Sequence, residues 1–286
     1  MQSTHVGRVA LVRQVGSVLA AVVVALVVTF GGALALPSAA RAAGNVADGK
    51  AKSVACQACH VASASDTPHL AGQREAYLAK QLKAFKAGER KNPLMSAIAT
   101  QLSDTDIENL ATYWGAQNAN SDNNLSEAVS AIRKSQMPFP KEFPKGYVLY
   151  DTVKKDDQNA VSKSYINTLG LAAAKAGKPL PDGTSILVVN YAAKLDANKK
   201  PVAAKDGSWE VDKVMSYAGM ESRAGWGKDI PELLRNNNWN YGVFGPDKAT
   251  RGEINQAVCL ACHKPKSASS FVFGIKEIDA AAKALK

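Results

Sequence analysis

The chain has 286 residues, which is enough for about two domains. Its hydrophobic fraction of 46% is ordinary for a globular protein and excludes disorder throughout. Its formal net charge is +10, but no basic helix interleaved with aromatic residues occurs, so we expect no nucleic-acid partner. The positive excess could steer an acidic partner or an anionic substrate, or it could be a solvated lysine-rich surface.

Residues 1–42 have the pattern of an export signal. Arg8 and Arg13 form a positive start, an apolar run follows from Val18 to Leu36, and Ala40-Arg41-Ala42 is an A-x-A cleavage site. We therefore expect a cleaved signal and a periplasmic mature chain that begins at Ala43. The alternative is an uncleaved membrane anchor, because the apolar run is nearly long enough to span a bilayer.

Residues 43–120 are expected to form a helical first domain. Helical spacing covers Val46 to Cys59, and an amphipathic helix is predicted from about Arg74 to Lys86, with Gly88 at its end. A loop should then carry Asn92 to Met95. Ser103 is placed to cap a last helix, whose first turn is acidic.

The four cysteines of the chain all lie in two motifs of the form C-x-x-C-H, Cys56-Gln57-Ala58-Cys59-His60 and Cys259-Leu260-Ala261-Cys262-His263. This is the attachment signature of c-type haem, in which two thiols form thioethers to one porphyrin and the histidine binds the iron. Half a zinc site or a redox dithiol has the same C-x-x-C spacing. A paired zinc site would hold its second pair about 15–20 residues away, whereas here about 200 residues intervene. The motifs therefore predict two covalent haems.

The first domain resembles the class I cytochromes c of the c-553 and c4 kind. The resemblance rests on C-x-x-C-H, P-x-L-A-G-Q, the Y-L-x-x-Q-L helix, the methionine loop and L-S-D-x-D-I-x-x-L-A-x-Y, from about Asp48 to Trp114. It implies that His60 is the proximal and Met95 the distal iron ligand, and that the Pro68 carbonyl faces the His60 ring N–H. Met95 is the only methionine of this domain. His69 is the competing ligand.

Residues 121–142 are expected to be a linker, since an Asn/Ser/Asp-rich stretch at 119–126 precedes a short helix and a proline-rich entry. In residues 143–286 the periodicity changes to that of strands. Strands are predicted at 147–153, 185–191, 209–217 and 238–244, and helices at 164–176 and 250–261. The last helix delivers Cys259, Cys262 and His263. The expected fold is α+β, an all-α domain followed by a mainly antiparallel β-sheet domain with a C-terminal haem-binding helix.

The second domain resembles the cytochrome P-460 and cytochrome c′-β family. The resemblance rests on F-P-K-G-Y, G-K-P-L-P-D-G-T, A-G-W-G and the late C-L-A-C-H followed by Phe271-Val272-Phe273. It implies an antiparallel sheet domain, often dimeric, with one haem. Enzymatic members cross-link a lysine to the porphyrin, but the strand after Thr184 has no lysine, and Lys178 and Lys194 only flank it.

The second iron is expected to have His263 as its only protein ligand, because the mature chain has just three histidines. Met137, Met215 and Met220 are the available sulfurs, and Met215 reads as a core residue. Glu221 could act as an acid near the open position or could be an ordinary solvated carboxylate. An open position can bind NO or CO, or can act on hydroxylamine-like substrates.

Three functions follow from this reading. The first is electron transfer between a low-spin His/Met haem, a second haem and an outside redox partner, and the absence of the lysine favours it. The second is an oxidoreductase that acts on hydroxylamine or a related nitrogen compound, with no catalytic residue assigned. The third is NO binding without turnover.

Overall fold

The computed structural model describes residues 44–60, 66–118, 127–252 and 254–285. The expected export signal and the Asn/Ser/Asp-rich stretch at 119–126 lie outside the described residues. All described residues belong to one unit of the chain, Ala43–Lys286. Within the described part, no helix is both long and apolar enough to cross a membrane.

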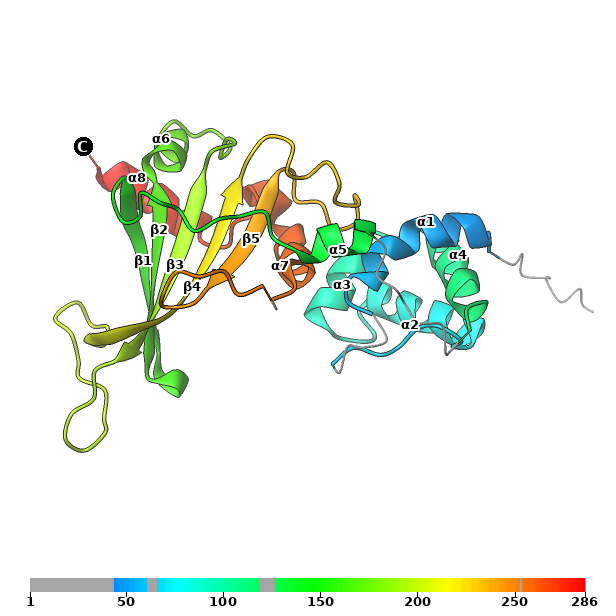
Figure 1. Cartoon of the computed structure of the whole chain (residues 1–286), viewed down its shortest axis with the longest axis horizontal. Coiled ribbons are helices and arrows are strands. Elements are labelled where there is room, and N and C mark those ends of the chain that lie inside the picture. Colours follow the sequence, from blue (N-terminus) through cyan, green and yellow to red (C-terminus); the bar gives the residue numbers. More distant parts are fainter. Residues whose placement is uncertain (1–43, 61–65, 119–126, 253, 286) are drawn as a thin grey trace, which may run out of the picture. The chain divides into compact units, whose positions relative to one another are not determined.

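The first part of the chain is helical (Figure 1). Its helices are α1 (Val46–Gln57), α2 (Glu75–Ala87), α3 (Pro93–Ala99) and α4 (Asp104–Gly115). The Ser103 side chain accepts from the Asp106 N–H, and the Asp106 side chain accepts from the Ser103 N–H, which is a capping box. α2 ends at Gly88, which has a left-handed φ of 77°. The predicted cap and end are thus confirmed.

α3 replaces part of the expected methionine loop. The Asn92 side chain accepts hydrogen bonds from the N–H groups of Leu94 and Met95, and Pro93 occupies the first helical position. Met95 therefore lies in the first turn of a short helix and not in a loop. Asn followed by Pro is a helix-start signal, so the local sequence contained this information.

The second part is built on a five-stranded antiparallel sheet in the order β1-β2-β3-β4-β5. The strands are β1 (Tyr147–Lys155), β2 (Ala160–Asn167), β3 (Ser185–Ala193), β4 (Val211–Ser222) and β5 (Trp239–Phe244). The helices of this part are α5 (Glu127–Arg133), α6 (Thr168–Lys175), α7 (Gln256–His263) and α8 (Ile275–Ala284), with 3₁₀ turns at Asp156–Gln158 and Lys264–Ser269. The predicted α+β class is confirmed.

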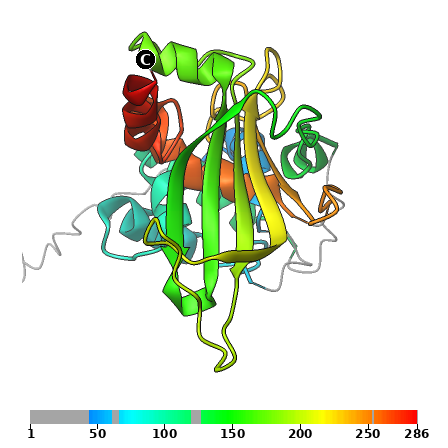
Figure 2. The ribbon, with the colours of Figure 1, turned by 90° about the vertical axis from the view of Figure 1, so that its left-hand side faces the viewer.

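The two faces of the sheet carry different cores. On one face, which we call the α7 face, Ile166, Ile186, Met220 and Tyr241 are register partners and pack with residues of α7 and α8. On the opposite face, Leu187, Val189, Tyr217 and Phe244 pack with Met137. Figure 2 looks onto this opposite face, with α7 (orange) behind the sheet and α8 (red) beside the edge strand β1.

Two sequence predictions need correction here, and one helix was missed. The expected helix at 164–176 is a strand up to Asn167, because residues 160–166 pair with β3, and only then does α6 begin under an Asn167 cap. The helix expected from residue 250 begins only at Gln256, where Asn255 caps it. α8 was not predicted, although its apolar residues Ile275, Ile278 and Ala282 recur at helical spacing.

Gly49 allows the close contact between α1 and α4. A Cβ at this position would overlap the backbone oxygen of Asn109 and would lie 2.7 Å from Tyr113 Cβ. We expect Gly49→Ala to lower the free energy of unfolding by about 1–3 kcal/mol, because helix backbones must move apart. Gly115→Ala is the matched control, since its Cβ would lie 3.4 Å from its nearest neighbours. Chemical denaturation of both variants checks this, and equal stability would contradict the close-contact interpretation.

Candidate haem attachment sites

The first C-x-x-C-H motif lies at the end of α1. The N–H groups of Cys59 and His60 donate to the Cys56 carbonyl at 3.1 and 2.8 Å, so a tight turn brings the two thiols and the ring together. His60 is buried, and its Nδ1 lies 2.8 Å from the Pro68 carbonyl oxygen. This is the contact that the class I resemblance implied. With Nδ1 donating, Nε2 keeps its lone pair for a metal.

The second motif has the same arrangement on a different fold. Cys259, Cys262 and His263 lie on α7, and His263 Nδ1 is 2.7 Å from the Phe271 carbonyl oxygen. In both sites the carbonyl belongs to the eighth residue after the histidine. The Phe271 contact was not predicted, although the spacing from His60 to Pro68 could have indicated it. Tyr241 and Phe273 hold the ring, with centroids 4.7 and 4.8 Å from that of His263.

The surface of α7 beside its cysteines fits a large apolar group. Ala257, Leu260 and Ala261 are buried, whereas Val258 is 43% exposed and Cys262 is exposed on the other side of the helix. Phe273, next to the His263 ring, is 53% exposed. Such a patch of uncovered apolar side chains around an iron-ligand candidate is the surface that a porphyrin would cover.

The first site also contains two buried polar atoms with unused hydrogen-bonding capacity. The Trp114 indole N–H is buried beside the Cys56 thiol, and His69 Nε2 is buried too. His69 Nε2 makes no hydrogen bond to any residue that the structure describes, and the group beside the Trp114 N–H is the Cys56 sulfur, which is only a weak acceptor. Buried polar atoms are rarely left unpaired, so these atoms fit a crevice that holds a group with hydrogen-bonding capacity.

The titration properties of the thiols do not suit dithiol redox chemistry. Burial raises the pKa of Cys56 to about 12, and burial also raises the pKa of Cys59 and of Cys259. Reactive dithiols need a lowered thiol pKa. Burial lowers the pKa of His60 and of His263, against the opposing effect of their carbonyl hydrogen bonds, and so favours the neutral rings that bind metals.

The candidate distal ligand of the first site is half-buried. Met95 is flanked on α3 by Leu94 and Ile98, which pack on the same core as α7. His69, the competing candidate, directly follows Pro68, whose carbonyl faces the Nδ1 edge of His60.

Of the remaining candidates of the second domain, Met220 lies on the α7 face, and the others lie on the opposite face or at the surface. Met137 packs on the opposite face of the sheet, and Met215 is 42% exposed, so its interpretation as a core residue is wrong. Met220 is buried on the α7 face. Lys178 is exposed, and Lys194 is an exposed lysine whose Nζ lies 2.9 Å from Glu210.

Glu221 is neither solvated nor placed beside His263. It is buried and pairs with Arg223 at 2.5 Å. Its register partner in β3 is Ser185, which accepts from the Tyr147 hydroxyl at 2.8 Å. Neighbouring residues of a strand point to opposite faces, and Met220 lies on the α7 face, so Glu221 points away from α7.

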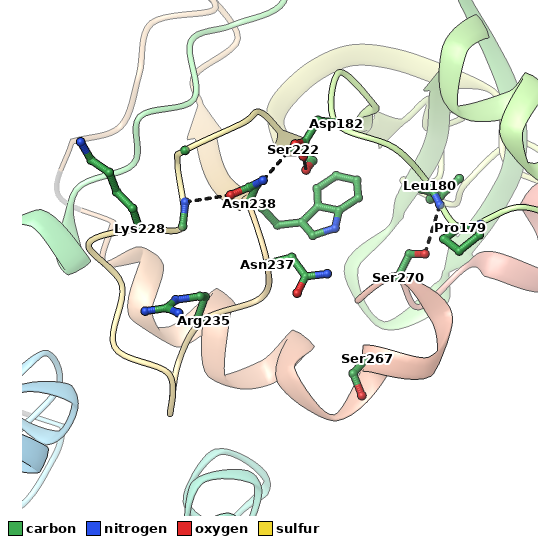
Figure 3. Close-up of a pocket in the computed structure, with 13 residues that line it drawn as sticks. Pro179, Leu180, Asp182, Ser222, Lys228, Arg235, Asn237, Asn238, Ser267 and Ser270 are labelled. Carbon is green, nitrogen blue, oxygen red and sulfur yellow. Dashed lines mark hydrogen bonds between the residues drawn. The ribbon is translucent and has the colours of Figure 1, made fainter.

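A polar pocket of 620 Å³ lies where the turn before β3, the loop after β4 and the segment after α7 meet (Figure 3). Asp182 anchors its rim, because it accepts hydrogen bonds from Ser222 and from Asn238. On another side, Ser270 accepts from the Leu180 N–H at 3.2 Å. None of the motif residues Cys259, Cys262 and His263 lines it. The G-K-P-L-P-D-G-T motif therefore has a structural role in joining the strands to the segment after α7.

Comparisons with known proteins find relatives for both parts of the chain. The Cytochrome P460 family matches residues 140–274. Cytochrome c4 of Pseudomonas aeruginosa is 43% identical over 88 residues, which are 29% of this chain and 44% of that protein. Cytochrome c-554(548) of Halomonas halodenitrificans is 38% identical over 82 residues, which are 26% of this chain and 99% of that protein.

A third relative is the thiosulfate dehydrogenase electron acceptor of Thiomonas intermedia, 43% identical over 68 residues, or 22% of this chain and 31% of that protein. The chain spans about half the length of the cytochromes c4 that it matches. These matches make it a c-type cytochrome, which carries covalently bound haem. More particularly, its N-terminal region belongs to the class I cytochromes c of the c4 and c-553 kind, and residues 140–274 match the Cytochrome P460 family.

Asn236 joins α7 to β5 beside the second site. Its Nδ2 donates to the Tyr241 hydroxyl at 2.9 Å and to the Leu260 carbonyl at 3.0 Å, and all three residues are buried. We expect Asn236→Ala to lower the free energy of unfolding by about 1–3 kcal/mol, because two buried groups lose their partner. Asn238→Ala, which loses an exposed bond to Asp182 and a long 3.4 Å bond from the Gly227 N–H, is the control and should cost less. Equal losses in a denaturant titration would contradict a special role for Asn236.

Proposed function

We propose that this protein is an exported, periplasmic electron-transfer cytochrome with two covalently bound haems. Cys56 and Cys59 would attach the first haem, with His60 and Met95 as iron ligands. Cys259 and Cys262 would attach the second, with His263 as its only protein ligand. When bound, each haem supplies an iron that changes reversibly between the ferrous and ferric states.

The observation that carries the proposal is the repeated hydrogen bond from a motif histidine to a carbonyl eight residues later. In each site this bond fixes the tautomer and the orientation of the ring, so that Nε2 is available to an iron. The same device on an all-helical domain and on a sheet domain supports one haem at each motif.

Met95 is proposed as the distal ligand because it is a half-buried sulfur at a defined position of a capped helix. His69 follows the proline that serves the Nδ1 edge of His60, which is the side away from Nε2. A thioether ligand stabilises the ferrous state and raises the reduction potential, which suits a carrier.

The second iron is proposed to keep an open position. Val188, Ala218 and Val243 are register partners in the middle of the α7 face and are only half-buried, so this face has apolar surface that the described residues do not cover fully. Neither Met137 nor Met215 lies in the core of this face. Both lysines that flank the strand after Thr184 are exposed, which supports electron transfer over an oxidoreductase that needs a cross-linked haem.

The partner is proposed to be a redox protein whose acidic residues meet the positive surface of this chain. The mature chain would carry 32 Lys and Arg against 25 Asp and Glu. The name of the Thiomonas relative describes an electron acceptor, which is consistent with a carrier role here. An assembly of two copies through the second domain belongs to the same proposal.

Counting the haems tests the proposal directly. We expect the mass of the denatured protein to include two haems, and Cys259→Ala/Cys262→Ala to retain one haem with a low-spin spectrum that carbon monoxide does not change. The matched variant Cys56→Ala/Cys59→Ala should retain one haem that binds carbon monoxide when reduced, since only that iron has an open position. One haem in the unmodified protein, or no carbon monoxide binding at the second motif, would refute the corresponding part.

The ligand assignment has its own test. Met95→Ala should abolish the weak near-infrared band that arises from a bond between a methionine sulfur and ferric iron, because Met95 is the only methionine of that domain. His69→Ala should leave the band in place. Absence of the band from the unmodified protein, or a band that survives in Met95→Ala, would refute the assignment of the methionine.

A further inference from the structure

One carbonyl group ties the two haem attachment motifs together. Ala58 lies between Cys59 and Cys56 in the first motif and is fully buried. Its oxygen accepts a hydrogen bond from Asn255 Nδ2 at 2.7 Å and another from Arg133 Nη1 at 2.9 Å. The first donor precedes α7, which carries the second motif, and the second donor belongs to α5.

Asn255 makes this bond while it caps α7. Its Oδ1 accepts from the Ala257 N–H at 3.0 Å, and its Nδ2 faces Ala58. The side chain thus has both of its polar ends engaged, one with each motif-bearing segment. Because a cap fixes the start of a helix, the direction of α7 is set by the same residue that holds the first motif.

Apolar side chains pack around the hydrogen bond between Asn255 and Ala58. Ala55 and Ala58 of the first motif region share one core with Ala257 and Leu260 of α7. Cys59 and Cys259 both pack against that core, and α3, which carries Met95, contacts α7. In this low-dielectric environment a hydrogen bond to a carbonyl is strong and costly to lose.

We infer that Asn255 is a positioning residue for electron transfer between the two haems, because it holds the Ala58 carbonyl of one attachment motif against the helix that carries the other. Arg133 supports the same carbonyl from α5. The inference rests on the proposed two-haem carrier, and it adds that electrons pass directly between the haems of a single chain.

Asn255→Ser tests this inference in the haem-loaded protein. Serine still caps a helix, but its side chain is too short to reach the Ala58 oxygen. After rapid reduction by pulse radiolysis, we expect the internal electron transfer rate to fall on the order of tenfold, since small displacements of reacting groups have large kinetic effects. The number of haems and the separate spectra should be unchanged. Asn255→Asp, which keeps the cap and turns the donor into a carboxylate, should have the same effect if the serine variant fails to fold.

Asn167→Ser is the matched control, because Asn167 caps α6 through Gly170 N–H and donates to the Gly183 carbonyl at 2.8 Å, within the second domain alone. Its internal rate should equal that of the unmodified protein. Two haems with an unchanged rate in the Asn255 variants would overturn this inference and leave the carrier proposal intact. An equal slowing in Asn167→Ser would also overturn it, whereas a single haem in the unmodified protein would refute both.

Discussion

The hydrogen bond from a histidine Nδ1 to a backbone carbonyl is the interaction on which both sites depend. A histidine directly after C-x-x-C has a free ring that could present either nitrogen. In this chain Pro68 and Phe271 remove that freedom, because each offers a carbonyl at 2.7 to 2.8 Å from Nδ1. The chain reaches the same result by two routes, a proline-containing loop in one domain and a 3₁₀ turn followed by left-handed residues in the other.

The order of the elements explains how two unrelated folds can share a core. In the first domain the motif ends the first helix, so its turn lies at the beginning of the domain. In the second domain the motif follows the whole sheet. The two motifs are therefore far apart in sequence, and their meeting depends on contacts such as those of Ala58, Val129, Ile132 and Leu260, all fully buried.

Local signals in the sequence were sufficient for much of this structure. The two motifs, the Ser103 cap, the Gly88 end and four of the five strands could be read from short patterns whose physical causes are local. The strand from Ala160 to Asn167 could not, because its alternating pattern is short and merges into the alanine-rich α6, and its identity depends on pairing with β3. Likewise, the burial of Glu221 depends on Arg223 and Ser185, and a one-residue shift of register would have reversed its face.

The contacts of Ala58 could not be predicted from the sequence either, because they also depend on tertiary structure. An asparagine before a helix predicts a cap, and that prediction accounts for only one half of the Asn255 side chain. The Nδ2 atom of Asn255 donates to the carbonyl of Ala58, which lies 197 residues away in the sequence. No sequence pattern around an alanine predicts that its carbonyl will accept such a bond. A covalent cofactor at each motif needs only local order, but a fixed relation between two such motifs needs tertiary contacts between them. The buried carbonyl with two donors supplies that relation.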